Sequence, residues 1–221
     1  MSTLEIDYDA YRIETMWQWS DPSSTPSPHY TARIAKTSIN RRGNILTAYL
    51  TPKGSASEPT PVILKMAYGM EHITSLEREA RMYENELRHL QGTVVPIYYG
   101  LYHGQTESRY QSGLREKVAC MVLEYCSSTD GMHPVDLGRN IVACTLSLHQ
   151  AGIVHNDLLN TRNIVQSADG GVRFLDFATA SRRHLCPTSV CKHGGGCQEI
   201  ALVERQYGGP TPQVPGYHGR W

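Results

Sequence analysis

Residues 153–179 read IVHNDLLNTRNIVQSADGGVRFLDFAT and carry two aspartates that each lie beside an apolar, strand-like segment. Asp157 lies in His-Asn-Asp-Leu, and Asp176 lies in Phe-Leu-Asp-Phe. Between them come a polar loop with Asn160 and Asn163, a short strand, an Asp-Gly-Gly turn and a second strand. Phosphoryl transfer from ATP needs one carboxylate to orient the attacking hydroxyl and a second, with an asparagine, to hold magnesium. The order of residues in this stretch indicates that chemistry.

The stretch resembles the catalytic and metal-binding loops of the protein-kinase-like superfamily, and upstream segments extend the resemblance. Residues 61–66 (PVILKM) read as an apolar strand with one lysine, Lys65, which the resemblance implies would bind the α- and β-phosphates of ATP. From the residues alone, Lys65 is equally a strand lysine whose ammonium reaches water. Residues 75–87 have apolar side chains at steps of three and four, which predicts an amphipathic helix. On it, the resemblance makes Glu79 the partner of Lys65. Nearby glutamates are rivals for that role: Glu77, Glu84 and Glu86.

Two more strands and a helix are predicted between these segments and the acidic stretch. Residues 93–102 and 118–125 read as strands, and residues 135–150 read as a helix that ends at an Ala-Gly pair. The second strand resembles the one that leads into the kinase hinge. By this resemblance, the backbone groups of Glu124 and Cys126 would meet the adenine edge of ATP.

The resemblance covers residues 30–185 and implies a fold as well as a site. The expected class is α+β, a two-lobed protein-kinase-like fold with an antiparallel-sheet N-lobe and a truncated, mainly helical C-lobe. The expected boundaries are an N-terminal extension and Ser/Pro-rich linker at 1–28, the N-lobe at 29–126, the reduced C-lobe at 127–206 and a flexible Gly/Pro-rich tail at 207–221.

The sequence also departs from the kinase pattern. The turn at residues 38–44, where a glycine-rich loop is expected, has one glycine, and few residues follow the metal aspartate Asp176. The family places its metal-binding asparagine five positions after the catalytic aspartate, where this chain has Arg162. A one-residue bulge would restore Asn163 to that role, and Asn160 is the alternate.

The resulting hypothesis is an ATP-dependent phosphotransferase that uses magnesium. In it, Asp157 accepts the proton of the attacking hydroxyl, and Asp176 with Asn163 carries the metal. Lys65, held by Glu79, grips the α- and β-phosphates. The acceptor is a protein serine or threonine, or a small alcohol. The alternative is a pseudokinase, a weak or inactive module that binds nucleotide or a partner without turnover.

Composition sets the expected surroundings. The chain has 21 Lys and Arg against 21 Asp and Glu, so its formal net charge is zero and nothing favours nucleic acid as a partner. The polar, acidic start does not resemble a signal peptide, and no apolar stretch approaches the roughly 20 residues that span a bilayer. We expect no membrane association and an intracellular, cytoplasmic location.

The six cysteines fall into two groups. Three lie in apolar strand or helix contexts and are expected to be buried free thiols: Cys120, Cys126 and Cys144. The others share a glycine-rich segment with histidines, and a zinc site is conceivable there from Cys186, Cys191, His193 and Cys197. The spacings match no common zinc module. An ordinary loop is the favoured reading, with metal binding and a redox-sensitive pair as the alternatives.

Overall fold

The computed structural model describes residues 2–9, 12–19, 29–39, 44–107, 113–185 and 197–208. These residues belong to two units. The first unit contains the described residues up to 85 together with 97–107 and 113–125. The second contains 86–96 together with the described residues from 126 onward. Each unit carries a different part of the predicted site, and each is described by itself.

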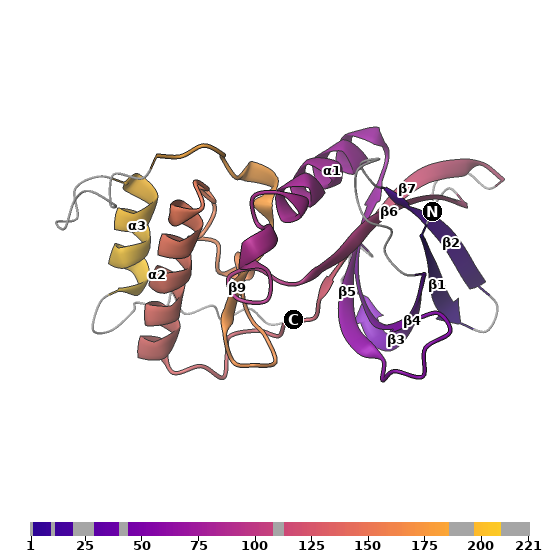
Figure 1. The fold of residues 1–221 in the computed structure, drawn as a ribbon, viewed down its shortest axis with the longest axis horizontal. Helices are drawn as coiled ribbons and strands as arrows, with labels where there is room; N and C mark the ends of the chain where they lie inside the picture. Colours follow the sequence, from indigo (N-terminus) through magenta and orange to yellow (C-terminus); the bar gives the residue numbers. More distant parts are fainter. Residues whose placement is uncertain are drawn as a thin grey trace. The chain divides into compact units, whose positions relative to one another are not determined.

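Seven strands of the first unit close into a barrel (Figure 1). Their order around the barrel is β1-β2-β6-β7-β5-β4-β3. Six of the pairings are antiparallel, and the parallel pairing of β1 with β3 closes the ring. The strands are β1 (Thr3–Asp9), β2 (Arg12–Trp19), β3 (Tyr30–Ile39), β4 (Ile45–Pro52), β5 (Thr60–Tyr68), β6 (Tyr98–Glu107) and β7 (Arg115–Glu124).

Alternating apolar side chains fill the barrel because successive residues of a strand point to opposite faces of the sheet. On β5, Val62, Leu64 and Met66 are buried in the same core cluster. β4 and β7 repeat the pattern with the buried residues Leu46, Ala48, Leu50, Val118, Cys120 and Val122. Lys65 therefore lies on the outer face of β5, between two residues that point inward.

A helix covers this outer face. α1 (Met70–Glu84) follows β5 directly and packs against β5, β6 and β7. Its buried side chains recur at helical spacing and include Leu76, Ala80 and Tyr83 together with one acid, Glu79. The helix thus buries a carboxylate on the same face as its apolar residues.

The second unit contains two α-helices and a small sheet among its described residues. α2 (Pro134–Gln150) packs against α3 (Gln198–Tyr207), and α2 also contacts β9 (Val172–Phe174). β9 pairs antiparallel with β8 (Ile164–Gln166). Short 3-10 helices at Arg88–Leu90, Thr161–Asn163 and Phe177–Thr179 complete the elements.

A buried cation joins residues 86–96 to β9. Arg173 is 3% exposed, and its Nη1 donates to the backbone oxygen of Thr93 at 2.8 Å. Its Nη2 donates to Gly92 and to the carboxylate of Asp169. The backbone N–H of Phe174 donates to Val94 at 2.8 Å. These bonds explain why a segment between two elements of the first unit belongs to the second.

The predicted two-lobed protein-kinase-like fold, with an antiparallel-sheet N-lobe and a truncated, mainly helical C-lobe, is wrong. The first unit is a closed, mixed seven-stranded barrel, and the described residues carry three α-helices, of 15, 17 and 10 residues. Residues 3–9 and 12–19 form β1 and β2 of the barrel, although the sequence predicts an N-terminal extension there. The barrel closes through backbone hydrogen bonds between strands that are distant in the sequence. The pattern of side chains along β1 and β3 does not reveal that these two strands pair.

Several individual elements are confirmed even though the fold is not. The strand predicted at 61–66 lies within β5, and the helices predicted at 75–87 and 135–150 correspond to α1 and α2. The strand predicted at 93–102 begins only at Tyr98, because residues 93–95 turn back toward Leu90 through backbone hydrogen bonds.

Candidate functional site

Lys65 and Glu79 form an ion pair in the first unit. The Nζ of Lys65 lies 2.7 Å from Oε2 of Glu79. The Glu79 side chain is 2% exposed and the Lys65 side chain is 28% exposed. A buried carboxylate is costly unless it is paired, so Lys65 supplies the charge that lets Glu79 remain inside.

The rival glutamates have other partners. Glu77 lies 3.5 Å from Nε2 of His103, and Glu84 accepts a 2.9 Å hydrogen bond from the hydroxyl of Tyr98. In the second unit, Glu86 pairs with Arg182 at 3.1 Å. Glu79 is therefore the glutamate that the structure brings to Lys65.

The two predicted adenine-binding positions lie where β7 ends. Glu124 is bound to Ile97 through both its backbone and its side chain: its N–H donates to the Ile97 oxygen at 2.9 Å, and its Oε2 accepts from the Ile97 N–H at 3.0 Å. Cys126 follows as a half-buried free thiol. These contacts tie the end of β7 to Ile97.

In the second unit, two asparagines converge on Asp157. The Nδ2 of Asn163 lies 2.8 Å from Oδ2 of Asp157 and 3.0 Å from its backbone oxygen. Asn160 donates to the same Oδ2 at 3.2 Å, and its own Oδ1 accepts from the N–H of Arg162, which caps the 3-10 helix. Asn163 is buried, whereas Asn160 is exposed.

Asp176 is positioned through the residue that precedes it. The N–H of Leu175 donates to the backbone oxygen of Asn163 at 2.9 Å, and the oxygen of Leu175 lies 2.9 Å from Nε2 of His155. Because a carbonyl can only accept, His155 carries its proton on Nε2. Leu175 is thus held on both sides, by the loop residues 155 and 163, and Asp176 comes directly after it.

His155 is fully buried against aromatic rings. Its ring lies 4.7 Å from that of Phe177, and burial lowers its pKa below the ordinary value, which favours the neutral imidazole. Asp157 and Asp176 both act in the opposite direction on this pKa. The two carboxylates therefore lie within electrostatic reach of one ring. We call Asp157, Asn163 and Asp176 the acidic cluster.

Two residues of the site have left-handed backbones. Asn156 has φ 69° and Asp176 has φ 64°. Such conformations are uncommon for residues other than glycine and persist where surrounding contacts hold them. The side chain of Asn156 is held by the Thr179 oxygen at 2.8 Å and by the Ser181 hydroxyl at 2.9 Å.

Sequence reasoning missed Glu199, which anchors the loop from α3. One carboxylate oxygen accepts from the backbone N–H of Asn156 at 2.6 Å, and the other accepts from that of His155 at 3.1 Å. No local pattern marks this role, because Glu199 lies more than 40 residues further along the chain.

The predicted site residues therefore form one pair and one cluster. The pair, Lys65 and Glu79, belongs to the first unit, whereas Asp157, Asn163 and Asp176 belong to the second. Of the predicted zinc ligands, Cys197 is described, and Cys186, Cys191 and His193 lie outside the described residues.

The thiols expected to be buried differ in exposure. Cys120 is fully buried, whereas Cys126 and Cys144 are half-buried. Burial raises the pKa of the Cys144 thiol to about 11, so it remains protonated at neutral pH.

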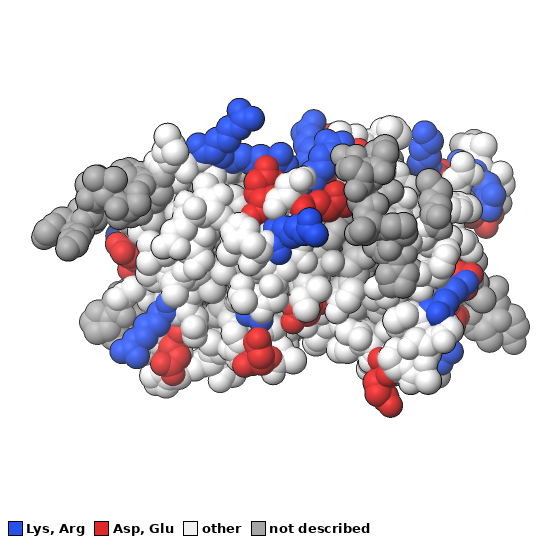
Figure 2. Space-filling model, in the orientation of Figure 1, with Lys and Arg blue, Asp and Glu red and all other residues white. Residues whose placement is uncertain are grey.

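Charged side chains on the face drawn in Figure 2 lie in small groups of both signs. Within the described part of the chain, no helix combines the length and the apolar character needed to cross a membrane.

Comparison with known proteins gives a partial similarity. No family model matches the chain. A stretch of 117 residues, which is 53% of this chain, is 28% identical to Meiotic driver SPOK2 of Podospora anserina. The matched part amounts to 14% of that protein's length. The similarity assigns no family to this chain.

Proposed function

We propose that this chain binds magnesium–ATP and transfers a phosphoryl group to a hydroxyl. The observation that carries the proposal is the acidic cluster, in which a buried asparagine holds Asp157 and the Asn163 and His155 contacts to Leu175 position Asp176. The similarity to a meiotic driver names no reaction, so the proposal depends on these residues.

The donor set of the cluster suits magnesium. Carboxylate and amide oxygens are hard ligands of the kind that Mg²⁺ prefers, and the carboxylate of Asp176 with Oδ1 of Asn163 would supply two of them. When bound, magnesium neutralises charge on the phosphates.

Asp157 would orient the acceptor. Because its Oδ2 already accepts two amide donors, the proton of the hydroxyl would pass to Oδ1. In the first unit, the Lys65 ammonium pairs with Glu79, and a lysine ammonium is a group of the kind that binds phosphate. Most of the rate enhancement would come from positioning and charge neutralisation. The acceptor class is a protein serine or threonine, or a small alcohol.

A titration of the full chain with ATP, with and without magnesium, tests the proposal through the melting temperature. A ligand that binds the native state stabilises it by RT ln(1 + [L]/Kd), so magnesium–ATP should raise the melting temperature. Asp176→Ala should lose the magnesium-dependent part. Asp136→Ala is the matched control, since Asp136 is an exposed aspartate on α2 of the same unit. An unchanged melting temperature at millimolar nucleotide would reject the proposal.

An assay of phosphoryl transfer distinguishes an active enzyme from a pseudokinase that binds nucleotide without turnover. If magnesium–ATP binds and labelled phosphate reaches neither protein, alcohol nor water, the chain is a nucleotide-binding module. Loss of binding in Asp176→Ala would then still locate the nucleotide site.

A further inference from the structure

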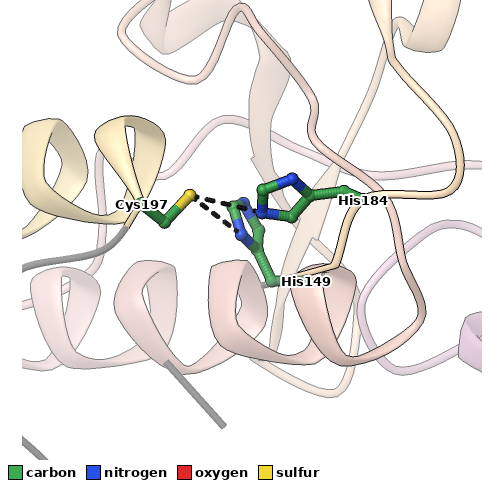
Figure 3. A group of neighbouring side chains, drawn as sticks. All are labelled: His149, His184 and Cys197. Carbon is green, nitrogen blue, oxygen red and sulfur yellow. Dashed lines mark hydrogen bonds between the residues drawn. The ribbon is translucent and has the colours of Figure 1, made fainter. Parts of the chain in front are cut away.

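Three side chains from separate segments meet on one sulfur atom in the second unit. Cys197 precedes α3, His149 lies in the last turn of α2, and His184 follows the 3-10 helix at Phe177–Thr179. The Sγ of Cys197 lies 3.3 Å from Nδ1 of His149 and 3.5 Å from Nε2 of His184 (Figure 3). All three ligand atoms lie within 4.8 Å of one another.

We propose that this His149–His184–Cys197 cluster is a zinc site. Zinc binds thiolate sulfur at about 2.3 Å and imidazole nitrogen at about 2.0–2.1 Å with tetrahedral angles, which separates the two ligand atoms by about 3.6 Å. The observed sulfur–nitrogen separations are close to this value. A bound ion would hold the two imidazole nitrogens, which lie within 4.8 Å of each other, at a separation of about 3.3 Å.

The donor chemistry selects the metal class. One sulfur and two imidazole nitrogens suit zinc and other borderline or soft ions, whereas magnesium and calcium prefer oxygen. Three protein donors leave one tetrahedral position, which water fills in the minimal form of the site. Cys197 and His149 are both buried, which is typical of a site that stabilises structure.

Histidines that bind metal commonly donate a hydrogen bond from their second ring nitrogen, and Glu199 accepts such a bond from His149. Its Oε2 lies 2.6 Å from Nε2 of His149, so the carboxylate accepts the Nε2 proton and the lone pair of Nδ1 faces Cys197. A carboxylate on the far nitrogen fixes the ring and raises its strength as a ligand. The same Glu199 binds the backbone of residues 155 and 156, so the metal would also brace the loop that carries Asp157.

A chain of hydrogen bonds is the competing arrangement. His184 would donate to the sulfur, and the thiol would donate to His149. That arrangement gives the same three side chains hydrogen-bond partners without an ion. Stoichiometric metal binding through Cys197 therefore distinguishes the zinc site from the hydrogen-bond chain. The zinc proposal is independent of the proposed phosphotransferase activity.

The test is the metal content and cobalt spectrum of the full chain, purified without chelator. We expect about one zinc per chain by elemental analysis, because buried thiolate and imidazole donors bind zinc tightly. After removal of zinc, cobalt should give the thiolate-to-cobalt charge-transfer absorption that only sulfur ligation produces.

Variants locate the site. Cys197→Ser should abolish the charge-transfer band, and His184→Gln should weaken zinc binding by at least about 100-fold. Glu199→Gln should weaken it by about 10- to 100-fold, as expected for an outer contact. Cys144→Ser is the matched control, since Cys144 is another free thiol of the same unit, and it should bind like wild type.

Three results would overturn the assignment. They are the absence of stoichiometric zinc and of the cobalt band in wild type, retention of that band by Cys197→Ser, and equal loss of binding in Cys144→Ser. If Cys197→Ser does not fold, the variant His184→Gln still tests the proposal, because His184 is half-exposed. Unchanged zinc affinity in folded His184→Gln would contradict the zinc site.

Discussion

The buried amide of Asn163 donates from one nitrogen to both the side chain and the backbone oxygen of Asp157, at 2.8 and 3.0 Å. This double contact fixes the direction of the carboxylate relative to its own backbone. The backbone oxygen of Asn163 also accepts from Leu175, so a single residue links Asp157 to the segment that carries Asp176.

Replacement of Asp157 by asparagine should separate binding from chemistry. Asp157→Asn keeps the size of the side chain but cannot accept a proton, and general bases contribute about 10²- to 10⁴-fold to rate. We expect magnesium–ATP binding close to wild type by calorimetry and a loss of phosphoryl transfer in that range. Equal transfer rates would show that Asp157 is not the base.

The two asparagines should differ in their effect on magnesium. Asn163 is buried and bound to both Asp157 and Leu175, whereas Asn160 is exposed and caps a 3-10 helix. Asn163→Ala should raise the magnesium concentration needed for half-maximal nucleotide binding by tenfold or more, while Asn160→Ala leaves it nearly unchanged. The reverse order would assign the metal to Asn160.

The Lys65–Glu79 pair should respond asymmetrically to substitution. Lys65→Ala removes the cation that pairs with the buried Glu79 carboxylate, so the free energy of unfolding should fall by up to about 3 kcal/mol. This value is at the lower end for buried ion pairs because Lys65 is partly exposed. Glu79→Gln should cost less, since the freed ammonium can reach water.

Chemical denaturation measures both free energies of unfolding. Glu77→Gln is the control on the same helix, and it should change stability little because its contact with His103 is long and part-exposed. A larger loss in Glu79→Gln than in Lys65→Ala would contradict the burial argument.

Acid should destabilise the protein through His155. Burial lowers the pKa of this histidine in the native state, while the unfolded chain titrates near the ordinary 6.5. Below pH 6.5 the unfolded state therefore binds a proton that the native state does not, and the free energy of unfolding falls as the pH falls. Above that pH the penalty is absent.

His155→Gln removes this titration. Its free energy of unfolding should depend less on pH between 6.5 and 5 than that of wild type, although its value at pH 8 is lower because Leu175 loses a well-placed donor. Parallel pH slopes for the two proteins would show that His155 does not titrate differently on unfolding.

Local patterns predicted the elements and the composition of the acidic loop. The alternation in residues 61–66 and the three- and four-residue steps in residues 75–87 identify β5 and α1, because periodicity records which face of an element is buried. The same reasoning placed Asn163 and Asp157 in one loop, and short-range geometry brought them together.

Longer-range relationships required the tertiary structure. Glu77, Glu79 and Glu84 occupy one helix, and only the packing of α1 on β5 decides which of them meets Lys65. Glu199 and Cys197 likewise gain their partners from α2 and from the loop at 155–156.

The sequence by itself determined where β5, β7, α1 and α2 form and which polar residues share a loop, since these follow from interactions between near neighbours. The tertiary structure alone decided that the strands close into a mixed barrel through β1 and β3, and that His149, His184 and Cys197 converge. Contacts between residues far apart in the chain depend on its path through space, and that path is set by the collective packing of the core.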